Sequence, residues 1–318
     1  MRYAGLHVVC WTWILLGAAV AGLGAEPAPE TVRVGLYLLD LYGLQSGGDT
    51  YTADFFLWFR WEGDLDPSQF EILNGHLEER ADPDRRTFGN LNYVSYRCRA
   101  LLHTRLDPSN YPWDEQLLSI QIEDANHDVR RLEYLPDHAA CGCSPELRLG
   151  DWEIGSLRCY ARPVVYDTTY GLPSRAPGEK AAYSRFFAVL PVRHHGVMPY
   201  LKTFIILYIS VGIAFLAFLI APAVAEARLD IMVPAVFGVT TSYILTSSHI
   251  PSSTTWAMVD RLHFLGMFFV FLAILESCIV IRLWRAEQRD RSVRWDRWAR
   301  VIVPLAFVAL AALGSLRW

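Results

Sequence analysis

Apolar and polar positions divide the chain into two halves that meet near Pro199. Before this residue, short apolar runs rich in β-branched and aromatic residues alternate with turn residues, and no long stretch has a helical period. We expect strands over residues 32–38, 51–61, 90–106, 116–122, 129–135, 152–165 and 184–192. Short strands at this spacing are typical of an immunoglobulin-like antiparallel sandwich, so we predict an all-β domain over residues 26–192.

The second half contains four apolar blocks, each long enough to approach or reach the span of a lipid bilayer as a helix. They predict membrane-spanning helices at about residues 199–223, 227–250, 258–284 and 298–317. Residues 193–318 are therefore expected to form a four-helix bundle embedded in a lipid bilayer. These blocks account for much of the 53% share of hydrophobic residues, which is above the usual share for soluble proteins.

The N-terminus has the pattern of a secretory signal peptide over residues 1–25. Arg2 precedes a short apolar core from Val8 to Ala21, and small residues follow it up to Ala25. An uncleaved membrane anchor is the alternative. In both cases the β domain is expected outside the cytoplasm.

The charges test this orientation. With the β domain outside, four crossings return the C-terminus to the outside, and the one long inside loop is expected at residues 282–300. This segment holds seven arginines and three acidic residues, as the positive-inside rule requires. The β domain is acidic, since residues 26–192 hold 26 acids and 16 bases. No basic patch indicates binding to nucleic acid.

The second predicted span, Glu226 to Pro251, carries acids, hydroxyls and a proline on one helical face. This face holds Glu226, Asp230, Pro234, Phe237, Thr241, Ile244 and Ser248. Carboxylates and hydroxyls are unfavourable against lipid. The helix is therefore either buried among other helices, with its hydroxyls bonded to its own carbonyls, or the wall of a pore. Pro234 has no N–H for the carbonyl of Asp230, so we expect the helix to kink or loosen there.

Four cysteines lie in the predicted β domain: Cys98, Cys141, Cys143 and Cys159. Disulfides are the default in an exported domain, and four cysteines allow three pairings. His138 near Cys141 leaves a metal site as the alternative, but no metal or cofactor is expected. No nucleophile motif, metal pair or nucleotide loop is visible, which excludes most enzyme classes.

The chain resembles bacterial members of the pentameric ligand-gated ion channel (Cys-loop receptor) family over residues 32–318. Tyr111-Pro112-Trp113-Asp114 is similar to the aromatic-Pro-x-Asp core of the family's signature loop. Arg193 matches the arginine before the first membrane helix, and Arg228 lies just inside the second span. The signature disulfide is absent, because Thr104 and Leu118 stand where its cysteines would be. The family's Trp-x-Pro segment is also missing, since the chain reads D-P-S-Q-F from residue 66.

The resemblance implies a homopentamer, in which four identical subunits partner each chain in the inner membrane of a bacterium. It implies a small-molecule or proton agonist bound between subunits of the outer domain. In such a ring, Glu226 and Asp230 form carboxylate rings at the inner mouth, and these predict selectivity for monovalent cations. Phe237 and Ile244 are candidates for a dewetting constriction, with ordinary packing between helices as the alternative.

The resemblance also implies a coupling group between the two domains. It consists of Asp49, Tyr111, Pro112, Trp113, Asp114 and Arg193, with Arg193 expected to pair with Asp114 and Asp49. Candidate agonist-binding residues are Phe56, Trp58, Arg60, Glu123, His127, Tyr166 and Tyr170. Aromatic rings suit an ammonium ligand, although most aromatics in a sandwich belong to its core. The histidines His194, His195, His249 and His263 are expected near the same junction and suit a proton agonist.

A non-conducting, membrane-anchored ligand sensor of the same fold is the main alternative. It accounts for the sandwich and the four spans. It does not account for two acids on one face of the second membrane helix.

Overall fold

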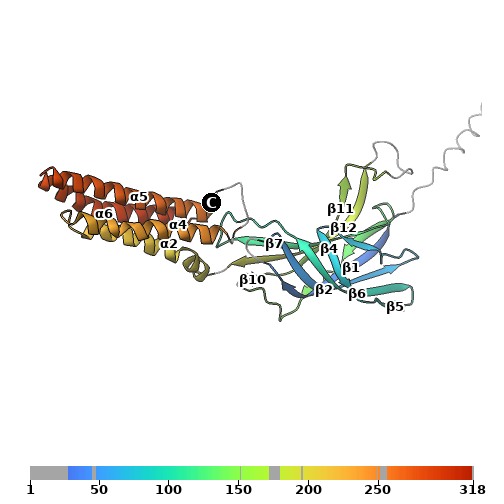
Figure 1. Cartoon of the computed structure of the whole chain (residues 1–318). Coiled ribbons are helices and arrows are strands. Elements are labelled where there is room, and N and C mark those ends of the chain that lie inside the picture. The colour runs from blue at the N-terminus through green and yellow to red at the C-terminus, as the bar shows by residue number, and fades with distance from the viewer. Residues whose placement is uncertain are drawn as a thin grey trace, which may run out of the picture.

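The computed structural model describes residues 28–44, 48–150, 152–171, 180–194, 196–248, 250 and 256–316. The protein is elongated, with a β domain at one end and a helical bundle at the other (Figure 1). The expected signal peptide lies outside the described residues. The same is true of His195, His249, residues 172–179 and residues 251–255.

The β domain is built from twelve named strands within the described ranges. These are β1 (Glu30–Tyr42), β2 (Thr50–Glu62), β3 (Phe70–Ile72), β4 (Gly75–Arg80), β5 (Asp84–Phe88), β6 (Leu91–His103), β7 (Glu115–Asp124), β8 (Leu132–Pro136), β9 (Gly142–Cys143), β10 (Trp152–Ile154), β11 (Arg158–Tyr166) and β12 (Ala181–His194).

Two sheets face each other and enclose one apolar core. The first has the order β4-β6-β2-β1-β8, with β5 beside β6 and β9 beside β1. The second has the order β10-β12-β7-β3, with β11 beside β12. Alternate residues of the central strands point inward, so that Phe55, Leu57 and Phe59 of β2 are fully buried. The predicted all-β sandwich is confirmed.

The strands without a sequence signal are those at the sheet edges. Every residue of β5 is exposed, and β4 buries none of its residues fully. The sequence analysis did not predict β4 and β5, because it relied on alternating apolar residues and these two strands are largely polar. The predicted strand over residues 152–165 is in fact two strands, β10 and β11, because the chain leaves the sheet between Ile154 and Arg158.

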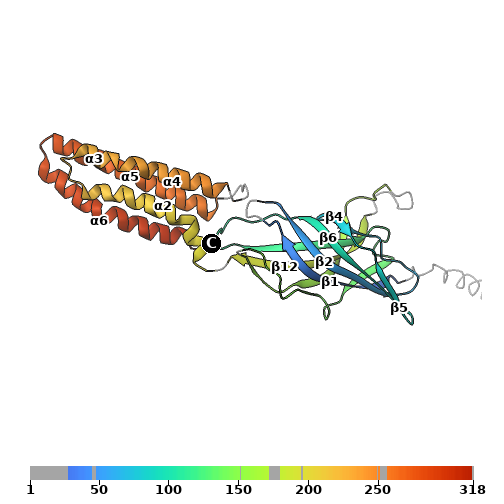
Figure 2. The ribbon, with the colours of Figure 1, turned by 60° about the horizontal axis from the view of Figure 1, so that its bottom comes forward.

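Four helices in the described chain are long and apolar enough to cross a membrane. Within these spans, α2 (Met198–Leu216) continues into the short helix η1 (Ala217–Leu219), and α3 (Ala225–Asp230) is followed by α4 (Met232–Ser247). The last two are α5 (Met258–Arg285) and α6 (Arg289–Gly314). Figure 2 shows α3 at the end of the bundle farthest from the β domain. The chain is thus a multi-pass membrane protein with its N-terminal β domain outside.

The expected long inside loop at residues 282–300 is wrong. Helix α5 ends at Arg285 and α6 begins at Arg289, so only three residues connect them. The charged segment is helical because Ser292 and Asp296, two of its polar residues, are buried against the rest of the bundle. The arginines still lie at the inner end of the bundle, so the positive-inside rule predicts the same orientation of the chain in the membrane.

Candidate functional site

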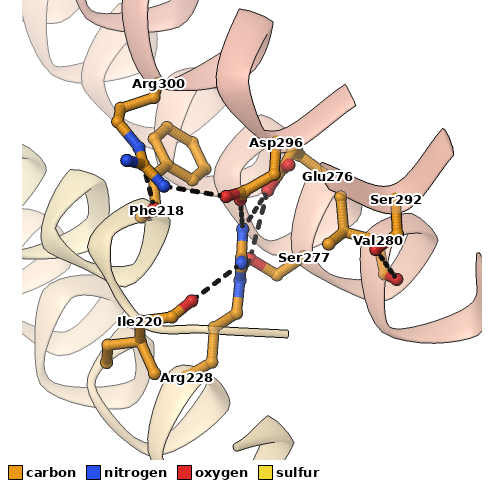
Figure 3. A network of polar contacts seen from close by, with 9 residues as sticks. All are labelled: Phe218, Ile220, Arg228, Glu276, Ser277, Val280, Ser292, Asp296 and Arg300. Atoms are coloured by element: carbon orange, nitrogen blue, oxygen red, sulfur yellow. Dashed lines mark hydrogen bonds and ion pairs between the residues drawn. The ribbon is translucent and has the colours of Figure 1, made fainter. Parts of the chain in front are cut away.

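A buried polar network holds the inner end of the helical bundle together (Figure 3). The Arg228 side chain on α3 has no exposed surface, and its Nη2 lies 2.7 Å from Glu276 Oε2 and 2.6 Å from Asp296 Oδ1. Its Nε donates to Ser277 Oγ at 2.9 Å, and its Nη1 donates to the Ile220 carbonyl at 3.1 Å. One arginine therefore joins α3 to α5, α6 and the end of the first span.

Asp296 receives a second guanidinium in the same network. Arg300 Nη2 lies 3.0 Å from Asp296 Oδ2, and its Nε donates to the Phe218 carbonyl at 3.1 Å. Two arginines thus balance the two acids, as buried charges require. Glu276 lies within a membrane span, where a carboxylate needs a polar partner, and Arg228 supplies it. Asp296 and Ser277 were missed, because nothing in their local pattern distinguishes them from surface residues.

The buried Arg228 side chain points into the bundle, and this determines where the side chains two positions before and after it point. Residues two positions away on a helix point roughly to the opposite side. Glu226 and Asp230 are accordingly exposed, and neither has an ion-pair partner among the residues that the structure describes. Both carboxylates lie at the inner end of the bundle, on the face turned away from the other helices.

One face of α4 packs against its own bundle. Met232, Ala235, Val239 and Ser242 are buried at spacings of three and four. Helix α2 approaches closely, since a Cβ on Gly238 would lie 2.2 Å from Ser210 Oγ. Ser242 Oγ lies 3.0 Å from His263 Nε2 on α5. These contacts fix the rotation of α4 about its axis.

The opposite face of α3 and α4 is uncovered in the chain. It consists of the seven residues expected to line a pore: Glu226, Asp230, Pro234, Phe237, Thr241, Ile244 and Ser248, all of which are exposed. Phe237 and Ile244 have 68% and 59% of their surface exposed. The helix is interrupted at Ile231, whose N–H reaches the Ala227 carbonyl at a long 3.4 Å. This interruption just before Pro234 agrees with the loosening predicted there.

An aromatic loop connects the β domain to the helices. The Trp113 ring stacks on Tyr200 of α2 at 4.7 Å between centroids, and its Nε1 donates to the Gly196 carbonyl at 3.1 Å. The Met258 N–H, at the start of α5, donates to the Ser109 carbonyl at 3.1 Å. The loop between β6 and β7 therefore contacts the first residues of two membrane helices.

A buried acid–histidine pair lies behind this loop. Asp114 Oδ1 lies 2.9 Å from His194 Nδ1 at the end of β12, and Asp114 Oδ2 accepts a bond from Gln116 Nε2 at 2.7 Å. The Trp152 ring stacks on His194 at 3.7 Å between centroids, and Tyr111 meets it edge-on at 5.8 Å. The structure thus brings Tyr111, Trp113 and Asp114 together at the junction.

The expected pairing of Arg193 with Asp114 and Asp49 is wrong within the described chain. Arg193 instead pairs with Glu153 of β10 at 3.2 Å. Successive residues of a strand point to opposite faces, so when His194 turns inward to Asp114, Arg193 must turn outward. Asp49 is exposed in the turn after β1, where its carbonyl accepts the Thr104 N–H.

The ligand-binding candidates of β2 share the outer face of the first sheet. Trp58 Nε1 and Arg60 Nη2 both reach Asp137 Oδ2, the former at 3.1 Å. Phe56, on the same face, is half-exposed. Asp137 is buried at the end of β8 and was not among the expected site residues.

A second group lies on the other sheet, around Glu123 of β7. The buried Glu123 carboxylate accepts bonds from Tyr166 Oη at 2.9 and 3.0 Å and from Arg185 Nε at 2.6 Å. Tyr170 meets the Tyr166 ring edge-on at 5.5 Å between centroids. Burial, together with the Glu123 carboxylate, raises the pKa of Tyr166 to about 12, so this phenol remains a neutral donor.

The chain's own cation occupies this aromatic cluster. The Arg185 guanidinium lies 5.7 Å from the centre of the Tyr166 ring and 5.8 Å from that of Phe187. An ammonium ligand would have to compete with it, contrary to the interpretation of these rings as an ammonium site. His127 is separate, since its Nδ1 bonds Asp124 at 2.8 Å. The ligand-binding candidates on β2 and those around Glu123 on β7 lie on different sheets. A single chain therefore does not bring them together into one site.

An outer β-sandwich joined through an aromatic loop to four membrane-spanning helices is the arrangement that the resemblance to ligand-gated ion channels implies. No family model matches the chain. A protein of Gloeobacter violaceus that is named a proton-gated ion channel is 23% identical over 303 residues, which cover 88% of this chain and 81% of that protein. A match of this extent includes both the sandwich and the helices. The chain is therefore similar to an ion channel over most of its length.

Proposed function

We propose that five copies of this chain form a cation-selective, ligand-gated channel whose pore is lined by α3 and α4. The observation that supports this most is the uncovered face of these helices. Its two carboxylates would lack partners in hydrocarbon, whereas a ring of identical subunits would turn them toward water. Helices α2 and α5 already cover the other side, which leaves this face for the axis.

Cation selectivity follows from the charges along the permeation path. Five copies of Glu226 and Asp230 would form two rings of carboxylates at the inner mouth, and such rings concentrate cations and repel anions. The outer domain adds an excess of ten negative charges per chain over residues 26–192, which raises the local concentration of cations. Phe237 and Ile244 supply the apolar rings that would close the pore by dewetting.

Protons are the agonist that the geometry favours. Arg185 fills the aromatic cluster that would otherwise suit an amine. The Asp114–His194 pair, in contrast, joins two titratable groups next to the loop that contacts the helices. Histidine changes charge between about pH 5 and 8. The similarity to a proton-gated channel points the same way, and a small-molecule agonist bound between subunits remains the alternative.

Current recording from the purified protein in planar bilayers tests this function. We expect currents that appear as the outer pH is lowered, and a pentameric mass in native mass spectrometry. A folded protein without current at any pH, and with none on addition of small amines or acids, would favour a non-conducting sensor of the same fold. Currents that require an amine at constant pH would retain the channel and overturn the proton agonist.

A further inference from the structure

Two cysteines far apart in the sequence meet where the two sheets of the sandwich join. Cys141 directly precedes β9, which pairs with β1 of the first sheet. Cys159 lies on β11, where it is paired with Ala188 of β12 in the second sheet. Their thiol groups are hydrogen-bond partners. A bond between these sulfur atoms would therefore link one sheet to the other.

The surroundings distinguish this pair from the other cysteines of the domain. Cys159 is buried and Cys141 is half-buried, with its Sγ accepting the Leu36 N–H at 3.5 Å. Cys98 is buried on β6, opposite Phe55 of β2. Cys143 lies opposite Leu38 of β1, one strand position beyond Gly142. Among the cysteine pairs that this domain could form, the geometry favours Cys141 with Cys159.

The two thiols are chemically unequal. The hydrogen bond from Cys159 stabilises the thiolate of Cys141 and lowers the pKa of Cys141. The same contact, together with burial, raises the pKa of Cys159. Since the thiolate is the reactive form, the more accessible Cys141 is the attacking group and Cys159 is the group that completes the reaction.

We propose that Cys141 and Cys159 form a disulfide once the domain has been exported. The Cys141 thiolate attacks a disulfide carried by a thiol oxidant protein outside the cytoplasm, forms a mixed disulfide and releases one thiolate of that oxidant. The Cys159 thiolate then attacks Cys141 Sγ and displaces the second thiolate. The two cysteines lose two electrons and two protons in total, and the oxidant's disulfide is reduced to a dithiol.

This disulfide would close a loop that reaches the junction with the membrane domain. The loop between the two cysteines contains Trp152, which stacks on His194, and Glu153, which pairs with Arg193. A covalent link at its base restricts the movement of the unfolded chain and keeps both contacts in register with the end of β12. The proposal depends on the exported location of the domain and not on ion conduction.

Peptide mapping of the full-length protein, purified from membranes without reductant and alkylated before digestion, tests the proposal. We expect a cross-linked pair of peptides containing Cys141 and Cys159, two hydrogens lighter than the sum of the free peptides and lost on reduction. Cys143→Ser is the matched control and should retain this cross-link, while Cys141→Ser should leave Cys159 open to alkylation. Alkylation of all four thiols, or a cross-link that joins Cys141 or Cys159 to Cys98 or Cys143, would overturn the proposal.

Thermal unfolding supplies a second readout. A reductant should lower the Tm of the wild type and leave the Tm of a Cys141→Ser, Cys159→Ser double variant unchanged. An equal effect of reductant on both proteins would contradict a structural disulfide at this place. The peptide map of the unaltered protein decides the matter even if the double variant does not fold.

Discussion

The two halves of the molecule place charge differently. In the β domain the core between the sheets is apolar, and many of the ion pairs lie at the surface, as for Arg193 and Glu153 with 55% and 47% of their side chains exposed. The buried pairs of this domain, Glu123–Arg185 and Asp114–His194, each link two strands or a strand and a loop. In the helical bundle one charged network lies inside, at the centre of the helix contacts. Arg228, Glu276 and Asp296 have 0%, 7% and 7% of their side chains exposed.

The solvent accounts for this difference. Water solvates the charges of the outer domain, so its strands are held together by burial of apolar side chains. Lipid is as apolar as leucine and gives helices little reason to associate through apolar contact alone. Partnered polar groups then determine which helices meet. The uncovered face of α3, which we propose lines the pore, follows from this arrangement, because the buried Arg228 points Glu226 and Asp230 the other way.

Removing the central arginine of the bundle should have the largest effect. In Arg228→Ala, Glu276 and Asp296 lose their shared partner, and breaking a buried pair typically costs about 3–5 kcal/mol. We expect poor yield of folded protein and a strongly lowered Tm in detergent, measured by size exclusion and circular dichroism. Arg282→Ala, at an exposed arginine of the same end, is the control and should behave like the wild type.

A core substitution in the β domain tests the other half of the comparison. Phe59 is fully buried, and its ring lies 5.6 Å from Phe70 and 6.0 Å from Tyr134. Phe59→Ala should destabilise the domain by about 3 kcal/mol through the cavity that it leaves. Phe88→Ala, at an exposed phenylalanine of β5, should change chemical denaturation very little. Similar losses in the two variants would contradict an apolar origin of the domain's stability.

Substitution at the junction should change gating more than folding. Trp113→Ala removes a stacked pair with Tyr200 that contributes about 1 kcal/mol beyond its burial. If this contact differs between closed and open states, the equilibrium between them shifts roughly fivefold, which bilayer recording would detect as a moved activation curve. Trp298→Ala, at an exposed indole of α6, is the control. Identical activation curves would exclude a coupling role for Trp113.

The exposed ion pair of the same region should matter least for stability. In Arg193→Ala, Glu153 is left in contact with water, which compensates for the lost partner. We expect a Tm equal to that of the wild type. A lowered Tm would mean that Arg193 is buried by another subunit in the assembled protein.

The sequence predicted the features that depend on repetition. Alternating apolar residues located the long central strands, and continuous apolar blocks located the four spans. The spacing of three and four residues also identified the uncovered face of α3 and α4. Edge strands β4 and β5 and the polar start of α6 were not predicted, because their contacts lie outside the repeating pattern.

Pairwise contacts between distant residues were the least predictable part of the site. Arg193 was expected to pair with Asp114, but its neighbour His194 does so instead. Which of two successive strand residues faces Asp114 depends on strand register, which no local pattern reveals. Asp137 and Arg185 became visible as site residues only when folding brought them to Arg60 and Glu123. The family resemblance located the junction loop correctly but assigned its acid to the wrong partner.

The reversal potential of the channel in a salt gradient tests the central claim most directly. If Glu226 and Asp230 line the pore, the wild-type reversal potential should be close to the equilibrium potential of the cation in the gradient. The double variant Glu226→Gln, Asp230→Asn retains the side-chain shapes and should move this potential toward zero or toward the anion value. The matched control Asp290→Asn, at an exposed acid of α6 near the same membrane surface, should leave it unchanged. An unaltered reversal potential in the double variant would contradict the assignment of this face to the pore.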